Sequence, residues 1–114
     1  MEFNELVSRA HEVSRRFDES NMDRYGQVWG LQELMLGFVG DVGDLSKLVQ
    51  ARTGLRDADD VDARLAHELA DCLWSVIVLA ERCNVDLEKA FVGTMSDLEG
   101  LIASGRYRDR PAAV

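Results

Sequence analysis

Apolar residues recur every three or four positions along almost the whole chain, and no stretch alternates between apolar and polar residues for long. This spacing is typical of amphipathic α-helices. The pattern predicts an all-α fold, a four-helix bundle, with helices at about residues 4–18, 27–52, 60–83 and 86–105. Polar residues at 20–26 and acidic residues at 56–62 are interpreted as loops. We therefore expect a single domain over residues 1–105 and a charged, frayed tail over residues 106–114.

Residues that end helices support these boundaries. Gly54, Asn84 and Gly105 each follow an amphipathic run and are of the types that adopt the left-handed conformation after a helix. Asp86 precedes the fourth run and is a good N-cap, and Asp59 or Asp60 is expected to cap the third helix.

The third predicted helix is apolar on almost every side from Leu69 to Ala80. A helix of this kind is buried on all sides. Four helices in a chain of 114 residues can hardly bury one of their number so completely. We therefore expect a homo-oligomer, a homodimer or homotetramer, with this helix in the interface. The alternative is a tight monomeric bundle that leaves Trp74 or Ile77 partly exposed.

Charge and composition narrow the class of protein. A net charge of −8 argues against nucleic acid or an anionic membrane surface as the main partner. The longest apolar run, Leu73 to Ala80, is too short to span a bilayer. Cys72 and Cys83 lie inside helical patterns without metal-ligand spacing and are interpreted as core residues of a cytoplasmic protein.

Two pairs of carboxylates, Asp41 with Asp44 and Glu68 with Asp71, have i, i+3 spacing and border an apolar stripe. This spacing places both members of a pair on one face of a helix. Carboxylates beside a core are costly without a partner, and hard divalent cations such as Mg²⁺ or Mn²⁺ take oxygen ligands. If the two helices pack together, the four groups form a metal site. The alternative is close helix packing with solvated aspartates at its margin.

Other side chains are candidates for binding a phosphorylated ligand beside such a metal. Glycines on the same side of the second helix indicate a close approach by a backbone or a ligand: Gly30, Gly37 and Gly40. Lys47, Arg64 and Arg82 are candidate phosphate-binding residues, although charges at such spacing are often solvated. Trp29 and Tyr25 are candidates for stacking on a base, although isolated aromatic residues in helical proteins are more often core.

Three segments together resemble a known family: G-D-V-G-D-L at residues 40–45, E-L-A-D-C-L-W at 68–74 and V-D-L-E-K-A-F at 85–91. They look like the MazG-like, all-α nucleoside triphosphate pyrophosphohydrolases, and the resemblance covers roughly residues 27–95. The signature of that superfamily is E-E-x-x-E followed by E-x-x-D on the next helix. In this chain Gly40 stands at the first glutamate and aspartates replace the other two, while Thr94 stands at a lysine common in the family.

The resemblance implies Mg²⁺-dependent cleavage of a nucleoside or deoxynucleoside triphosphate to the monophosphate and pyrophosphate. It also implies that the signature acids bind the metal and serve catalysis, at positions Asp41, Asp44, Glu68 and Asp71. The departures from the signature leave a second hypothesis open. In that hypothesis the protein is a non-catalytic helical module that binds nucleotides or metal and acts as a regulator or partner subunit.

Overall fold

The computed structural model describes residues 1–106, and in that part of the chain the secondary structure is entirely helical. Four helices follow one another: α1 (Phe3–Tyr25), α2 (Leu31–Arg52), α3 (Val61–Arg82) and α4 (Leu87–Ala103). The all-α class and the number of helices predicted from the sequence are thereby confirmed. Most of the tail predicted at residues 106–114 lies outside the described residues.

Helices α2 and α3 end as their sequences predict. After α2, the N–H groups of Gly54 and Leu55 donate to the carbonyls of Ala51 and Gln50, at 3.1 and 2.8 Å. Gly54 has a φ of 86°, the left-handed conformation that this reversal requires. The same pair of bonds follows α3, where Asn84 takes the left-handed position with a φ of 57°.

The start of α4 also agrees with its sequence, whereas the start of α3 differs in detail. Asp86 caps α4 by accepting a hydrogen bond from the backbone N–H of Lys89 at 3.1 Å. Asp60 stands at the N-cap position of α3, but its side chain accepts no capping hydrogen bond and its φ is 49°.

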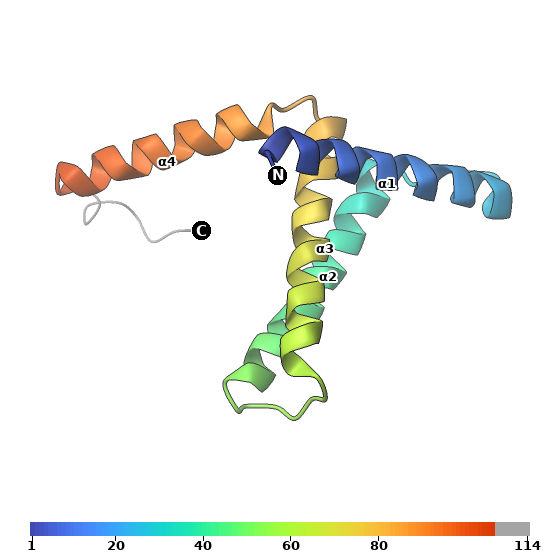
Figure 1. Ribbon diagram of the computed structural model, residues 1–114, viewed down its shortest axis with the longest axis horizontal. Helices are drawn as coiled ribbons and strands as arrows, with labels where there is room; N and C mark the ends of the chain where they lie inside the picture. The colour runs from blue at the N-terminus through green and yellow to red at the C-terminus, as the bar shows by residue number, and fades with distance from the viewer. Residues whose placement is uncertain (107–114) are drawn as a thin grey trace.

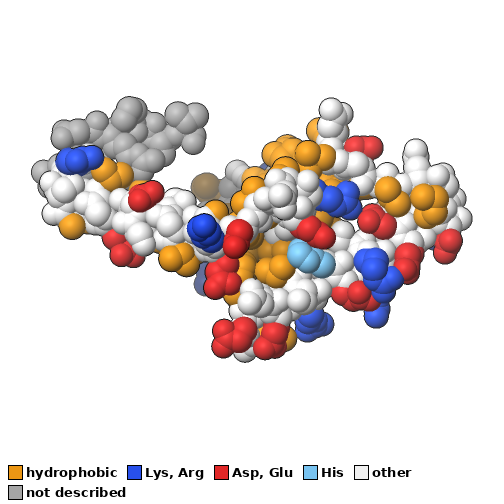
Figure 2. Space-filling view, turned by 90° about the horizontal axis from the view of Figure 1, so that it is seen from above, with side chains coloured by type: hydrophobic (Ala, Val, Ile, Leu, Met, Phe, Trp, Pro, Cys, Tyr) orange, Lys and Arg blue, Asp and Glu red, His pale blue; other side chains and the backbone are white. Residues whose placement is uncertain are grey.

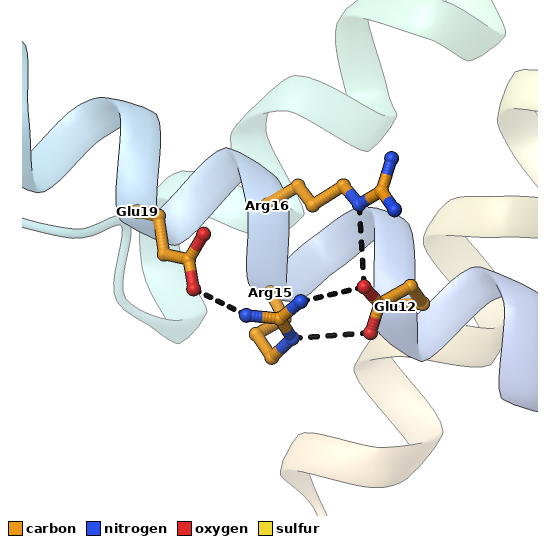
Figure 3. Close-up of polar contacts among 4 residues, drawn as sticks. All are labelled: Glu12, Arg15, Arg16 and Glu19. Carbon is orange, nitrogen blue, oxygen red and sulfur yellow. Dashed lines mark hydrogen bonds and ion pairs between the residues drawn. The ribbon is translucent and has the colours of Figure 1, made fainter.

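The predicted loop at residues 20–26 is wrong, because α1 continues to Tyr25 and ends at the left-handed Gly26. Part of the reason is a run of side-chain pairs along the exposed face of α1 (Figure 3). Arg15 bonds both Glu12 and Glu19, and Arg16 bonds Glu12 at 3.2 Å. Pairs at i, i+3 and i, i+4 stabilise a helix, and these span the position where the apolar pattern stops.

Helix α2 begins four residues later than predicted, at Leu31 instead of Gln27. In the segment before α2, the side chain of Trp29 packs against the helix. The Trp29 ring lies 3.1 Å from the point where a Cβ on Gly37 would lie. A side chain at position 37 would meet this ring. Of the three glycines, Gly37 is closely approached by a ring and Gly30 by Glu33, whose Oε2 lies 3.2 Å from its Cβ position. The Cβ position of Gly40 is open.

Helices α2 and α3 pack side by side as an antiparallel hairpin, and α1 crosses its open end (Figure 1). Several side-chain contacts join α1 to α3, among them His11 Nε2 with Glu81 Oε2 at 3.2 Å. The indole N–H of Trp74 donates to the carbonyl of Ala10 at 3.1 Å, and the Trp74 ring meets Phe17 edge-on at 5.8 Å. Arg82 pairs with Asp18 at 3.3 Å. These contacts form a junction between α1 and the hairpin, on one side of the carboxylate-bearing segments.

Helix α4 leads away from the other three helices and packs extensively against none of them (Figure 1). The radius of gyration is 17.5 Å, whereas a compact chain of this length has about 13 Å. Few apolar side chains are buried, and α4 exposes Phe91, Val92 and Ile102. The four helices of one chain thus do not close into a compact bundle, and the bundle and the homo-oligomer stay predictions.

Apolar side chains therefore remain at the surface, as Figure 2 shows around the region where α4 leaves the hairpin. Within one chain, only part of α3 is buried as predicted. Ile77 and Val78 are buried inside the chain, whereas Leu69, Leu73 and Val76 are exposed. In the described part of the chain, no helix combines the length and the hydrophobicity needed to cross a membrane.

Candidate metal centre between α2 and α3

The hairpin brings the two carboxylate pairs together at its middle. Ligand oxygens of Asp41, Asp44 and Glu68 all lie within 4.8 Å of one another. A second set with the same limit consists of ligand atoms of His67, Glu68 and Asp71. Glu68 belongs to both sets, so the four predicted acids form one cluster with Glu68 at its centre.

The local reason for this geometry is the helical spacing within each pair. Asp41 and Asp44 are one turn apart on α2, and Glu68 and Asp71 are one turn apart on α3. One turn keeps both side chains on one face. Because α2 and α3 pack antiparallel along their length, the two acidic faces meet across the hairpin.

The cluster carries unfavourable electrostatics in the absence of a counter-ion. Glu68 Oε2 is buried and has no hydrogen-bond partner within the described chain. Burial raises the pKa of Glu68 above its ordinary value, and the neighbouring charges of Asp71, Asp41 and Asp44 add to that rise. The pKa of Asp41 is raised in the same way, first by burial and then by Asp71 and Asp44.

His67 is a neighbour that the sequence interpretation did not include. Its Nε2 lies 3.1 Å from Oδ2 of Asp71, one helical turn away. The spacing i, i+4 between these residues was the available signal, since it places both on one face of α3.

The donor set fits a hard divalent cation. Three carboxylates from two helices supply oxygen ligands, and a buried, unpartnered oxygen of Glu68 points to a missing positive partner. Mg²⁺ binds through one or more carboxylates and keeps several waters, so a half-open site of this kind suits it. The four acids outnumber the one imidazole among them, which leaves charge for a metal to offset.

A cleft of about 670 Å³ opens on one side of the cluster, between α1 and the hairpin. Asp41 and Asp71 form part of its wall, and aromatic side chains form another part, namely Phe17, Trp29 and Trp74. Apolar clefts with a few polar groups are the usual form of small-molecule sites. Trp29, a candidate for stacking on a base, thus lines the same cleft as Asp41 and Asp71. Tyr25 is largely exposed and is not part of this wall.

The predicted phosphate-binding residues separate in the structure. Lys47 and Arg64 line a second cleft, beside the loop that joins α2 to α3, together with Asp44 and Glu68. Arg82 does not join them, because its guanidinium bonds Asp18 and the carbonyl of Trp29, both at 3.3 Å. Arg82 instead connects α1, the segment before α2 and the end of α3.

The two cysteines are unlike in their surroundings. Cys72 is half-buried beside the acids, and burial followed by the charges of Asp41, Glu68 and Asp71 raises the pKa of its thiol. A raised pKa keeps the thiol protonated at neutral pH, which disfavours thiolate chemistry there. Cys83 is exposed at the end of α3, so the interpretation of Cys83 as a core residue is wrong.

Comparison with known proteins gives matches to one kind of enzyme. The chain is 35% identical over 69 residues to dCTP pyrophosphatase 1 of Rattus norvegicus and of Mus musculus. It is 36% identical over 69 residues to dCTP pyrophosphatase 1 of Homo sapiens. Each match covers 56% of this chain and 41% of the relative, so the chain matches less than half the length of these proteins.

No known protein-family profile matches the chain. No solved structure matches it either. The sequence relationship is thus a partial homology to dCTP pyrophosphatase 1, which belongs to the MazG-like superfamily whose motifs the chain resembles.

Proposed function

We propose that the protein is a Mg²⁺-dependent nucleoside triphosphate pyrophosphohydrolase. The observation that carries the proposal is the convergence of carboxylates from α2 and α3 around the buried, unpartnered Oε2 of Glu68. The aromatic cleft beside these acids has room for a nucleoside, and the partial homology to dCTP pyrophosphatase 1 supports this class of substrate.

The reaction adds one water across the phosphoanhydride bond between the α- and β-phosphates. Water oxygen bonds to one of the two phosphorus atoms, the bridging P–O bond breaks, and the products are a nucleoside monophosphate and pyrophosphate. A bound divalent cation would offset the charge of the phosphate oxygens and lower the pKa of water. Asp41, Asp44 and Glu68 would hold this ion.

Asp71 has a different environment from the three ligands assigned to the ion. It lies outside their set and contacts His67 instead. We assign to Asp71 the orientation of the attacking water and the acceptance of its proton, with His67 holding the carboxylate in place. General-base assistance of this kind typically contributes about 10²- to 10⁴-fold to a rate.

The test is release of pyrophosphate from a panel of nucleoside triphosphates, beginning with dCTP, in the presence of Mg²⁺ or Mn²⁺. Turnover by the intact protein and its loss in Glu68→Gln are the expected results. A matched control is Glu99→Gln on α4, which removes an exposed acid outside the cluster.

Absence of turnover on every nucleotide tested would contradict the enzymatic proposal. Metal and nucleotide binding without turnover would favour the regulatory module instead, and Gly40 and Thr94 are the departures from the signature that give this second hypothesis its basis.

A further inference from the structure

The second cleft lies at the closed end of the hairpin and has a volume of about 460 Å³. Its wall combines two acids of the cluster, Asp44 and Glu68, with three cations, Lys47 from α2, Arg64 from α3 and Arg56 from the connecting loop. Arg56 belongs to a loop that the sequence analysis regarded as acidic. The cleft thus adjoins the candidate metal centre and has a different character from the aromatic cleft.

The three cations of this cleft form no ion pair with any residue in the part of the chain that the structure describes. Other arginines are paired: Arg15 and Arg16 with Glu12, and Arg82 with Asp18. Arg64 makes a single long contact, from its Nη1 to the carbonyl of Asp59 at 3.5 Å. The guanidinium of Arg56 and the ammonium of Lys47 are therefore available to an anionic ligand.

We propose that this cleft binds the terminal phosphates of the substrate, and that Arg56 is a determinant of specificity for a triphosphate over a monophosphate. This inference rests on the proposed function. It gives the substrate a direction: the base lies in the aromatic cleft, the phosphate chain crosses the carboxylate cluster, and the leaving pyrophosphate lies against Arg56, Lys47 and Arg64.

The charge balance of the cleft supports an anion only together with the metal. Its three cations face four acids, which are Asp44 and Glu68 from the cluster and Asp57 and Asp59 from the loop. A divalent cation on Asp44 and Glu68 offsets two of these charges, which leaves three cations against two acids. The cleft therefore selects a metal-complexed polyphosphate over a free one.

The side-chain types also match this role. Arginine presents a planar fork of N–H donors that bonds two phosphate oxygens at once, whereas lysine provides a compact charge. Arg56 lies on a loop near the metal centre, so it can approach a phosphate without displacing a packed helix. A charge-assisted hydrogen bond to phosphate is worth roughly ten- to hundred-fold in affinity.

The test is the dissociation constant of inorganic pyrophosphate, measured by titration calorimetry with Mg²⁺ at saturation. Arg56→Ala is expected to weaken pyrophosphate binding roughly ten- to hundred-fold, and Arg56→Lys is expected to restore part of the loss. Lys47→Ala and Arg64→Ala are expected to act in the same direction. The matched control is Arg9→Ala, which removes an exposed cation of α1 and is expected to change nothing.

The affinity of Arg56→Ala for dCMP distinguishes loss of the phosphate-binding cleft from misfolding of the variant. A monophosphate does not reach the cleft, so its affinity is expected to stay the same. The proposal is overturned if wild-type protein with Mg²⁺ binds no pyrophosphate, or if Arg56→Ala binds it as wild type does.

The outcomes for the proposed function are distinct from these. Turnover of dCTP with unchanged KM in the three variants would support the proposed function and reject phosphate binding in this cleft. Pyrophosphate binding that depends on Arg56, without any nucleotide turnover, would support phosphate binding in this cleft and reject the enzymatic proposal.

Discussion

Glu68→Gln is the change that tests the metal centre most directly. Glu68 is the residue shared by both sets of ligand atoms, and one of its oxygens is buried without a partner. Glutamine keeps the shape of the side chain but removes its charge and one acceptor oxygen. If a divalent cation binds the cluster, this one substitution removes the ligand common to both sets.

The magnitude follows from mass action. A ligand that binds only the folded state at 100 times its dissociation constant stabilises that state by about 2.7 kcal/mol. A chain of 114 residues has an unfolding entropy for which 1 kcal/mol shifts the melting temperature by about 4 °C. Saturating Mg²⁺ is therefore expected to raise the melting temperature of the wild type by about 10 °C, and that of Glu68→Gln by a small fraction of this.

The assay is a pair of thermal melts, with Mg²⁺ and with a chelator, for wild type, Glu68→Gln and Asp44→Asn. Glu99→Gln and Asp97→Asn on α4 are the matched controls, because they lose the same charges outside the cluster. Equal metal-induced shifts in wild type and both cluster variants would refute the site. A shift that vanishes equally in the α4 controls would show a nonspecific effect of charge.

Three further predictions concern pH, assembly and the junction of α1 with α3. The raised pKa of Glu68 means that the metal-free folded state binds more protons than the unfolded state between the ordinary and the raised pKa. Metal-free Glu68→Gln should therefore have a higher melting temperature than wild type at neutral pH. The difference should shrink as the pH falls through that window, and a difference that does not change with pH would contradict this. Leu73→Glu, at an exposed position of the apolar α3 run, is expected to give a smaller assembly by light scattering than wild type, whereas a monomeric wild type at micromolar concentration would contradict the interface. Arg82→Ala removes the contacts with Asp18 and the Trp29 carbonyl and should lower the free energy of unfolding by about 1 kcal/mol in urea titrations, with Arg9→Ala unchanged.

Several local features were predictable because short-range interactions determine them. The left-handed Gly54 and Asn84 end their helices through bonds to carbonyls within the preceding turn. Asp86 caps its own helix through Lys89, three residues away. The extension of α1 to Tyr25 was missed because its apolar pattern stops near Asp18, while ion pairs and a polar sequence continue the helix.

In the candidate metal centre, too, some features follow from local sequence and others from tertiary packing. The i, i+3 spacing places each acid pair on one face of its own helix, which is a property of helical geometry alone. Whether the face with Asp41 meets the face with Glu68 depends on how α2 and α3 rotate against each other, which is decided by packing. The raised pKa values of both groups follow from that meeting and from burial, and neither is readable in a sequence.

The sequence by itself determined the all-α class, the number of helices and most of their ends, since apolar periodicity and helix-ending residues act within a few positions. Tertiary structure decided which charged side chains share a site. It pairs Arg82 with Asp18, 64 residues away, and brings the loop residue Arg56 into the cleft beside Asp44 and Glu68. Such partners depend on the path of the backbone between helices, and an isolated charge in a sequence carries no signal of which opposite charge it will meet.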